Sequence, residues 1–178
     1  PEKLEAAIKA HPDAKVVAFV HAETSTGVRS DAETLCRLAK SAGMLVIVDA
    51  VTSLAGIDLK ADAWGADVVY SGTQKCLSGL PGISPITFSD DAVSAIQART
   101  QKVQSWFLDM NLIMGYWGEG AKRAYHHTAP VNAIYALHEA LLMLEEESLE
   151  ASIARHQDNH VTLAAGLSKL GLDLAVSE

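Results

Sequence analysis

The chain has 178 residues, of which 49% are hydrophobic and 20% are charged, and its formal net charge is −8. This composition is typical of a globular protein with a buried core. The acidic chain has no cluster of lysine or arginine, so nucleic acid is not an expected partner. No apolar run has the length of a membrane span, and the first residues do not resemble a signal peptide. We therefore expect a cytoplasmic protein without a membrane partner, although an organelle is also compatible with the sequence.

The two cysteines and the chain ends give further expectations. Cys36 and Cys76 have neither the spacing of metal ligands nor the density of a disulfide scaffold. We expect both to be free thiols, with Cys36 packed in a helix and Cys76 buried beside Lys75; a reactive thiol is the alternative for Cys76. The chain begins at Pro1, and residues 174–178 have the pattern of a strand that is just starting. We therefore expect a piece of a longer protein.

Hydrophobic periodicity predicts an alternation of helices and strands. A capping box, in which Ser30 accepts from the helix and Glu33 reaches back, predicts the start of the second helix, and Gly43 predicts its end. In chain order, the predicted elements are a helix over 3–10, a strand over 15–20, a helix over 30–42, a strand over 44–48, one helical turn within 58–64, a strand over 67–71, a strand over 84–88, a helix over 90–101, a helix over 130–147 and a helix over 149–170.

The order of these elements predicts the fold class. The strand–helix–strand unit over 15–48 is expected to cross over right-handed and to leave its two strands parallel. A tight GLPG turn at residues 79–82 indicates that the strand over 84–88 runs antiparallel to its neighbour. Strands that are apolar throughout need helices on both faces of the sheet. The predicted fold class is therefore α/β, with a mainly parallel sheet flanked by helices.

Two ionisable residues follow buried strands. Asp49 ends the apolar run 44–48, and Lys75 lies between the apolar run 68–70 and a glycine-rich loop. Partial burial of Lys75 would favour the neutral amine, which attacks carbonyls. Pyridoxal phosphate needs such a pair, because its aldehyde forms a Schiff base with a lysine while a carboxylate keeps its pyridine nitrogen protonated. Taken alone, an aspartate and a lysine at strand ends are more often a helix cap and a surface charge.

Four motifs resemble one family. They are HAETSTGV at 21–28, VDAVTS at 48–53, SGTQK at 71–75 and YHHT at 125–128. Together, and in this order, they are similar to the class V aminotransferases, and within these to the alanine–glyoxylate and serine–pyruvate aminotransferase branch. The resemblance covers nearly the whole chain. It implies the aspartate aminotransferase type of fold (fold type I) and the cofactor pyridoxal 5′-phosphate.

The resemblance also implies roles for five residues. Lys75 would be the catalytic lysine, which carries the cofactor and then moves a proton between the substrate Cα and the cofactor. Asp49 would hold the protonated pyridine nitrogen, and Val51 would pack on the ring. The Thr24 hydroxyl would donate to the phenolate oxygen of the ring, and Gln74 would contact the phosphate. Without the family, Thr24 and Gln74 are ordinary loop residues.

The YHHT motif precedes a helix that starts after a proline, a suitable place for phosphate donors. In the family this segment reaches across a homodimer, so Tyr125 and Thr128 would bind the partner's cofactor. His126 and His127 are adjacent and have no evident third ligand, so we assign no metal and expect structural hydrogen bonds. The aromatic segment 105–120 suits a subunit interface, although packing within its own domain is equally compatible.

Part of the family's active site has no counterpart in this sequence. The glycine-rich phosphate loop and a stacking aromatic lie before Pro1 in the family, and the arginine that pairs with the substrate carboxylate lies beyond Glu178. No arginine of the chain matches that position; those considered are Arg29, Arg37, Arg99, Arg123 and Arg155. We expect residues 1–146 to belong to the cofactor-binding large domain, and residues 147–178 to lead into a small C-terminal domain that is mostly absent.

The predicted activity is transamination between a small amino acid, alanine or serine, and a 2-oxo acid such as glyoxylate or pyruvate, with ping-pong kinetics. One alternative is another amino donor, such as ureidoglycine. A second is a lyase of the same fold, such as a cysteine desulfurase. That class usually has histidine where Gln74 stands, and Cys36 is poorly placed to accept sulfur. A non-catalytic α/β module is the remaining alternative.

Overall fold

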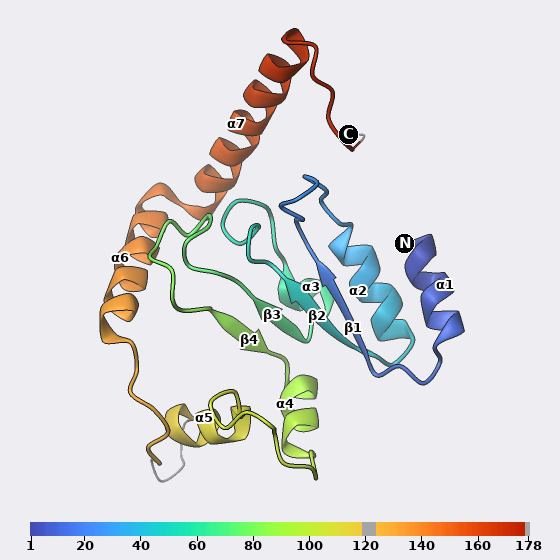
Figure 1. Cartoon of the computed structure of the whole chain (residues 1–178), viewed down its shortest axis with the longest axis vertical. Helices are drawn as coiled ribbons and strands as arrows, with labels where there is room; N and C mark the ends of the chain where they lie inside the picture. The colour runs from blue at the N-terminus through green and yellow to red at the C-terminus, as the bar shows by residue number, and fades with distance from the viewer. Residues whose placement is uncertain (119–123, 177–178) are drawn as a thin grey trace.

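The structure is a computed structural model that describes residues 1–118 and 124–176 (Figure 1). Its strands are β1 (Val16–Val20), β2 (Leu45–Asp49), β3 (Val68–Tyr70) and β4 (Ile86–Phe88). Its helices are α1 (Glu2–Ala10), α2 (Ala32–Ser41), α3 (Ala61–Trp64), α4 (Asp90–Gln97), α5 (Met110–Trp117), α6 (Val131–Glu147) and α7 (Leu149–Lys169). Every helix and strand predicted from the periodicity is present, and most of the bounds agree to within two residues.

The strands form one sheet in the order β1-β2-β3-β4. β1, β2 and β3 are parallel, and β4 runs antiparallel to β3, which confirms both predictions about strand direction. In the register of the sheet, Val20 pairs with Asp49 and Asp49 pairs with Tyr70. The carboxyl ends of the three parallel strands therefore meet at one edge, with Asp49 in the middle.

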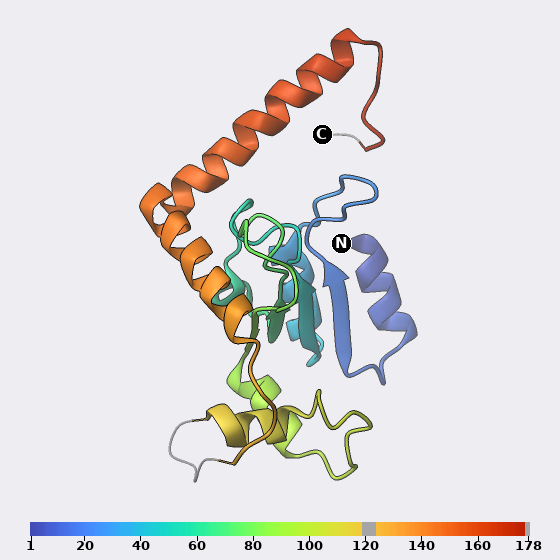
Figure 2. The same ribbon diagram turned by 60° about the vertical axis from the view of Figure 1, so that its left-hand side comes forward.

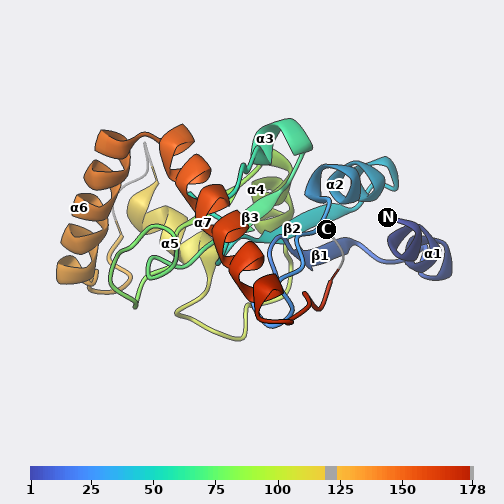
Figure 3. The same ribbon diagram turned by 90° about the horizontal axis from the view of Figure 1, so that it is seen from above.

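Helices pack on one face of the sheet. The core on this face joins Cys36 and Ala39 of α2 to Val46, Val48 and Val69 of the strands. Figure 3 shows α2 and α3 on the same side of the strands.

On the opposite face, part of the sheet surface is open. Val16 is 47% exposed and Ile86 is 50% exposed. Helices were predicted on both faces of the sheet. Among the described residues, the prediction is confirmed for one face, and the other face is partly open. The strands follow each other in one direction across the sheet, so right-handed crossovers place α2 and α3 on the same side. Covering the second face would require a reversal of strand order.

Helix α2 begins one residue later than the capping box predicted. Asp31, rather than Ser30, is the N-cap, and its carboxylate accepts a hydrogen bond from the Thr34 backbone N–H at 3.2 Å. The Ser30 hydroxyl instead donates to the Val20 carbonyl at 2.8 Å. The predicted roles of Ser30 and Glu33 were therefore wrong, because Ser30 is used to fasten the end of β1.

A buried carboxylate fastens the amino end of β3. Asp67 is 2% exposed, and it accepts hydrogen bonds from Lys40 Nζ at 2.9 and 3.1 Å, from the Val46 backbone N–H at 2.8 Å and from the Ser89 hydroxyl at 2.8 Å. Burial alone would raise the pKa of Asp67, but the hydrogen bonds from Lys40, Ser89 and Val46 outweigh it and lower that pKa. One side chain thus connects α2, β2, β3 and the start of α4.

The last helix, α7, extends away from the sheet (Figure 2). The first turn of α7 is anchored by the buried hydroxyl of Ser152, which donates to the Ala55 carbonyl at 2.8 Å. Further along α7, Leu163 is 61% exposed. None of the described helices has the length and apolar character needed to cross a membrane. Residues 174–176 form no strand, and the rest of the predicted strand start, 177–178, lies outside the described residues.

Candidate active site

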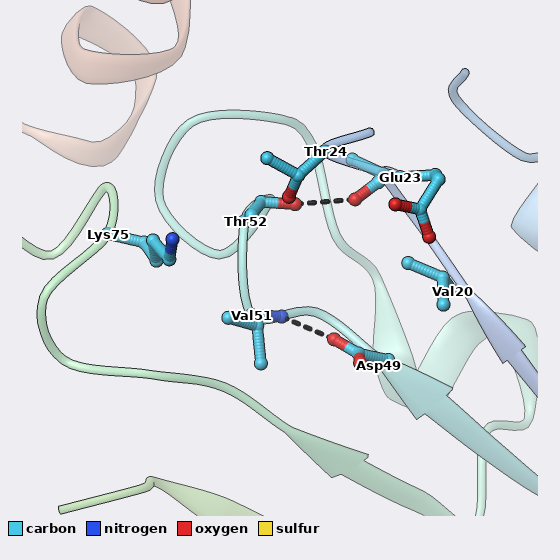
Figure 4. A pocket seen from close by; sticks show the side chains of 8 residues that line it. Val20, Glu23, Thr24, Asp49, Val51, Thr52 and Lys75 are labelled. Carbon is cyan, nitrogen blue, oxygen red and sulfur yellow. Dashed lines mark hydrogen bonds between the residues drawn. The ribbon is translucent and has the colours of Figure 1, made fainter. Parts of the chain in front are cut away.

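An open pocket of about 240 Å³ lies at the carboxyl ends of the parallel strands (Figure 4). The loops that follow β1, β2 and β3 each contribute to it, which is the usual place for ligands in open α/β sheets. The pocket is lined by Val20, Ala22, Glu23, Thr24, Asp49, Val51, Thr52 and Lys75. Four of the residues singled out in the sequence, Thr24, Asp49, Val51 and Lys75, are therefore brought together.

Both carboxylate oxygens of Asp49 accept a hydrogen bond. The Val51 backbone N–H donates to Oδ1 at 2.9 Å, and the Tyr70 hydroxyl donates to Oδ2 at 2.8 Å. The pKa of Tyr70 is raised, mainly because Asp49 accepts its proton in this hydrogen bond. Sequence reasoning missed Tyr70. The signal was its place at the end of β3, beside Asp49 at the end of β2, but it could be used only once the strand order was known.

Hydrogen bonds join the first two loops. The His21 backbone N–H donates to the Asp49 carbonyl at 2.9 Å, and the Thr52 hydroxyl donates to the Ala22 carbonyl at 2.5 Å. The buried His21 ring lies with Nδ1 at 3.0 Å from the Ser53 hydroxyl. Burial lowers the pKa of His21, because the charged imidazolium is disfavoured there. These contacts hold the loop that carries Thr24 against the loop that carries Val51.

Glu23 is a pocket residue that the motif comparison did not single out. Its carboxylate accepts hydrogen bonds from the Ser25 backbone N–H at 2.9 Å and from the Ser25 hydroxyl at 2.8 Å. These bonds lower the pKa of Glu23. Thr24 beside it is exposed. The first loop therefore offers a hydroxyl and a carboxylate to a ligand in the pocket.

Lys75 lies in the loop beyond β3, and its side chain extends toward the loop that carries Val51 and Thr52 (Figure 4). The side chain is exposed, so the partial burial expected from the sequence was wrong for the described chain. The physical reason is that β3 ends at Tyr70, which leaves Lys75 outside the sheet. Cys76 is half-buried, its thiol contacts the Thr52 carbonyl at 3.4 Å, and burial raises its pKa, as expected for an inert thiol.

Three predicted cofactor residues do not line this pocket. Gln74 is exposed, with its amide against the backbone of Gly72. Tyr125 is 73% exposed, and its hydroxyl lies 2.8 Å from that of Thr128. Of the arginines considered in the sequence, Arg123 lies outside the described residues, and the other four do not line the pocket.

The two adjacent histidines make structural hydrogen bonds, as predicted. His126 is buried, and its Nε2 lies 2.9 Å from the Trp106 carbonyl, so this nitrogen donates. In a neutral ring its Nδ1 then accepts, which makes His127 Nδ1 the donor across the 2.6 Å contact between the two rings. The His126 ring also stacks on Trp106, with centroids 4.1 Å apart. No cluster of three metal-ligating side chains occurs within 1–118 and 124–176.

Comparison with known proteins assigns the chain to a family. The model of the class-V aminotransferases matches residues 1–176. The chain belongs to the class V aminotransferases. The alanine–glyoxylate aminotransferase of Oryctolagus cuniculus is 43% identical over 161 residues, which cover 90% of this chain and 41% of that protein.

Solved structures of two aminotransferases agree with this assignment. The alanine–glyoxylate aminotransferase of Nostoc sp. superimposes with a TM-score of 0.93 at 46% identity, covering 99% of this chain and 46% of that one. The ureidoglycine–glyoxylate aminotransferase of Bacillus subtilis gives a TM-score of 0.90 at 37% identity, covering 97% and 44%. These structures confirm the predicted fold type. The chain spans less than half the length of each of these three relatives.

Proposed function

We propose that the protein is a pyridoxal-phosphate-dependent aminotransferase that moves an amino group between a small amino acid, alanine or serine, and a 2-oxo acid such as glyoxylate or pyruvate. Class V aminotransferases are pyridoxal-phosphate enzymes. The observation that carries the proposal is the arrangement of Asp49, Thr24 and Lys75 around one pocket. The relatives named for alanine and glyoxylate support the choice of substrates.

The donor set of the pocket fits the cofactor. A carboxylate has about four lone-pair positions, and Val51 and Tyr70 occupy only two of those on Asp49. Asp49 can therefore accept a further hydrogen bond from the pyridine N–H. The exposed Lys75 amine is free to bind the cofactor aldehyde, and Thr24 can donate to the ring oxygen. An amine and a hydroxyl from two loops and a carboxylate from the end of β2 match the aldehyde, the ring oxygen and the ring nitrogen of the cofactor.

Each residue would contribute a separate step. The bound cofactor supplies an electron sink for the substrate. Asp49 would keep the ring nitrogen protonated, and Val51 would fix the plane of the ring by packing against it. Once the amino substrate has displaced it, Lys75 would take the proton from the substrate Cα and pass it to the cofactor. Its exposed position leaves the amine free to move between these tasks.

The phosphate is proposed to be bound between two subunits of a homodimer. Gln74 would contact it from the same chain, and Tyr125 and Thr128 would reach the cofactor of the partner. The hydroxyls of Tyr125 and Thr128 are already paired, and Tyr125 is exposed and outside its own chain's pocket. The nearby aromatic segment supports such an interface, because its side chains are not buried in this chain; Trp106 is 57%, Phe107 55% and Leu108 66% exposed.

Ureidoglycine is the second candidate donor, supported by the similarity to the Bacillus subtilis enzyme. A desulfurase reaction is disfavoured by the state of Cys36. This thiol is fully buried, and burial raises its pKa to about 11, so it is neither accessible nor ionised as a sulfur acceptor should be. The choice between donors depends on the substrate pocket of the complete protein.

The proposal is tested by reducing the full-length natural protein with borohydride in the presence of pyridoxal phosphate, followed by peptide mapping. We expect one adduct, on Lys75, and none there in Lys75→Ala. Activity with alanine and glyoxylate should fall by at least about 10³-fold in Lys75→Ala, because attachment and proton transfer are both lost. An adduct spread over surface lysines would overturn the proposal. Activity with alanine, serine and ureidoglycine as amino donors identifies the substrate. Double-reciprocal plots are expected to be parallel, as in ping-pong kinetics.

A further inference from the structure

Tyr70 stands directly beside the carboxylate that is proposed to hold the cofactor. It is the last residue of β3, and the sheet register pairs it with Asp49, the last residue of β2. Residues paired across parallel strands point to the same face. The hydroxyl of Tyr70 can therefore reach Asp49 Oδ2, to which it donates at 2.8 Å. Tyr70 does not line the pocket, so any effect on a ligand must pass through Asp49.

The Asp49 carboxylate is held from two sides. The Val51 backbone N–H fixes Oδ1 and the Tyr70 hydroxyl fixes Oδ2. With only the Val51 contact, the carboxylate would turn about its terminal torsion, which is broad and weakly restrained in aspartate. With both contacts, its remaining lone pairs point in a fixed direction before any ligand arrives. A preorganised acceptor loses less conformational entropy on binding.

Tyr70 can act only as a donor in this arrangement. Asp49 accepts the phenol proton, and this hydrogen bond, together with partial burial, raises the pKa of Tyr70. The phenol therefore keeps its proton at neutral pH. Because Tyr70 always donates, its hydrogen bond holds the Asp49 carboxylate in one rotamer.

We propose that Tyr70 is a positioning residue for the cofactor: by holding Oδ2 of Asp49, it aims the carboxylate at the pyridine nitrogen. This inference rests on the proposed function, since it concerns how Asp49 meets the ring. Because Tyr70 does not line the pocket, it would touch neither the cofactor nor the substrate.

The test compares two cofactors in the full-length natural protein. The affinities of the apoprotein for pyridoxal phosphate and for its 1-deaza analogue, in which carbon replaces the ring nitrogen, are measured by equilibrium dialysis for the wild type and for Tyr70→Phe. Losing a hydrogen bond to a charged group should weaken pyridoxal phosphate binding by about tenfold. The deaza analogue cannot pair with Asp49, so its affinity should change by less than about twofold.

Each outcome decides the matter. A loss confined to pyridoxal phosphate supports the positioning role, whereas an equal loss for both cofactors, or no loss, overturns it. The matched control is Tyr135→Phe, which removes a phenol hydroxyl from a 72% exposed side chain of α6 and should change neither affinity. The thermal midpoint of apo Tyr70→Phe shows whether the fold is intact. If the wild type itself binds no pyridoxal phosphate, it is the proposed function that fails.

Discussion

Two aspartates at opposite ends of the same sheet have different tasks. Asp67, before β3, is 2% exposed and accepts four hydrogen bonds from one lysine, one serine and one backbone N–H. Asp49, at the end of β2, borders an open pocket and accepts two hydrogen bonds from the residues that the structure describes. A carboxylate whose hydrogen-bonding capacity is filled by its own protein serves stability. A carboxylate with acceptor positions left toward a pocket can serve a ligand.

The largest effect on stability is expected at Asp67, whose carboxylate has its hydrogen-bonding capacity filled by the protein. Asp67→Ala should lower the free energy of unfolding by about 3 kcal/mol, because it leaves the Val46 N–H and the Ser89 hydroxyl without their acceptor and removes the charge beside Lys40. Urea denaturation measures this value. Asp91→Ala is the matched control, since Asp91 also pairs with Lys40 but is 73% exposed, and it should cost less than about 1 kcal/mol. Equal costs would contradict a structural role specific to Asp67.

The same network should make stability depend on pH. The pKa of Asp67 is lowered from its usual 3.8 in the folded protein. A lowered folded pKa means that the contribution is fully present above the unfolded value and is lost as pH falls through the folded one. We therefore expect the difference in stability between wild type and Asp67→Ala to be constant from pH 7 down to about pH 5 and to shrink below about pH 4. A difference that persisted unchanged at the lowest pH would show that the charge is unimportant.

Replacing Asp49 should have the opposite effect, with little loss of stability and a large loss of cofactor affinity. In Asp49→Asn the amide oxygen can still accept from Val51, so we expect stability to change by less than about 1 kcal/mol. The neutral amide provides no negative charge for a protonated pyridine nitrogen, and the affinity for pyridoxal phosphate should fall by about tenfold or more. Denaturation and cofactor titration of one sample separate the two effects. A large loss of stability with unchanged affinity would reverse the assignment of the two aspartates.

The sequence was sufficient for the main pocket residues and for every described element except α5, whose segment was recognised only as aromatic. Asp49 and Lys75 follow apolar runs that became adjacent parallel strands, so local pattern placed them at one edge. It was insufficient for properties that depend on neighbours in space. Tyr70 meets Asp49 only through the register of the sheet, and Ser30 fastens β1 instead of capping α2. The exposure of Lys75 depends on where β3 ends. The sequence pattern of a strand of only three residues does not predict that end.

The smallest effect is expected from the hydrogen bond that joins the loop after β2 to the loop after β1. Thr52→Val keeps the shape of the side chain but removes the hydrogen bond to the Ala22 carbonyl, and it should cost about 1 kcal/mol of stability. Because Thr24 is carried by the loop thus released, the affinity for pyridoxal phosphate should also fall, by less than in Asp49→Asn. Thr52→Ser, which retains the hydroxyl, is the control and should resemble the wild type in both denaturation and cofactor titration. If Thr52→Ser lost as much affinity as Thr52→Val, the methyl group of Thr52, and not its hydrogen bond, would be what the pocket requires.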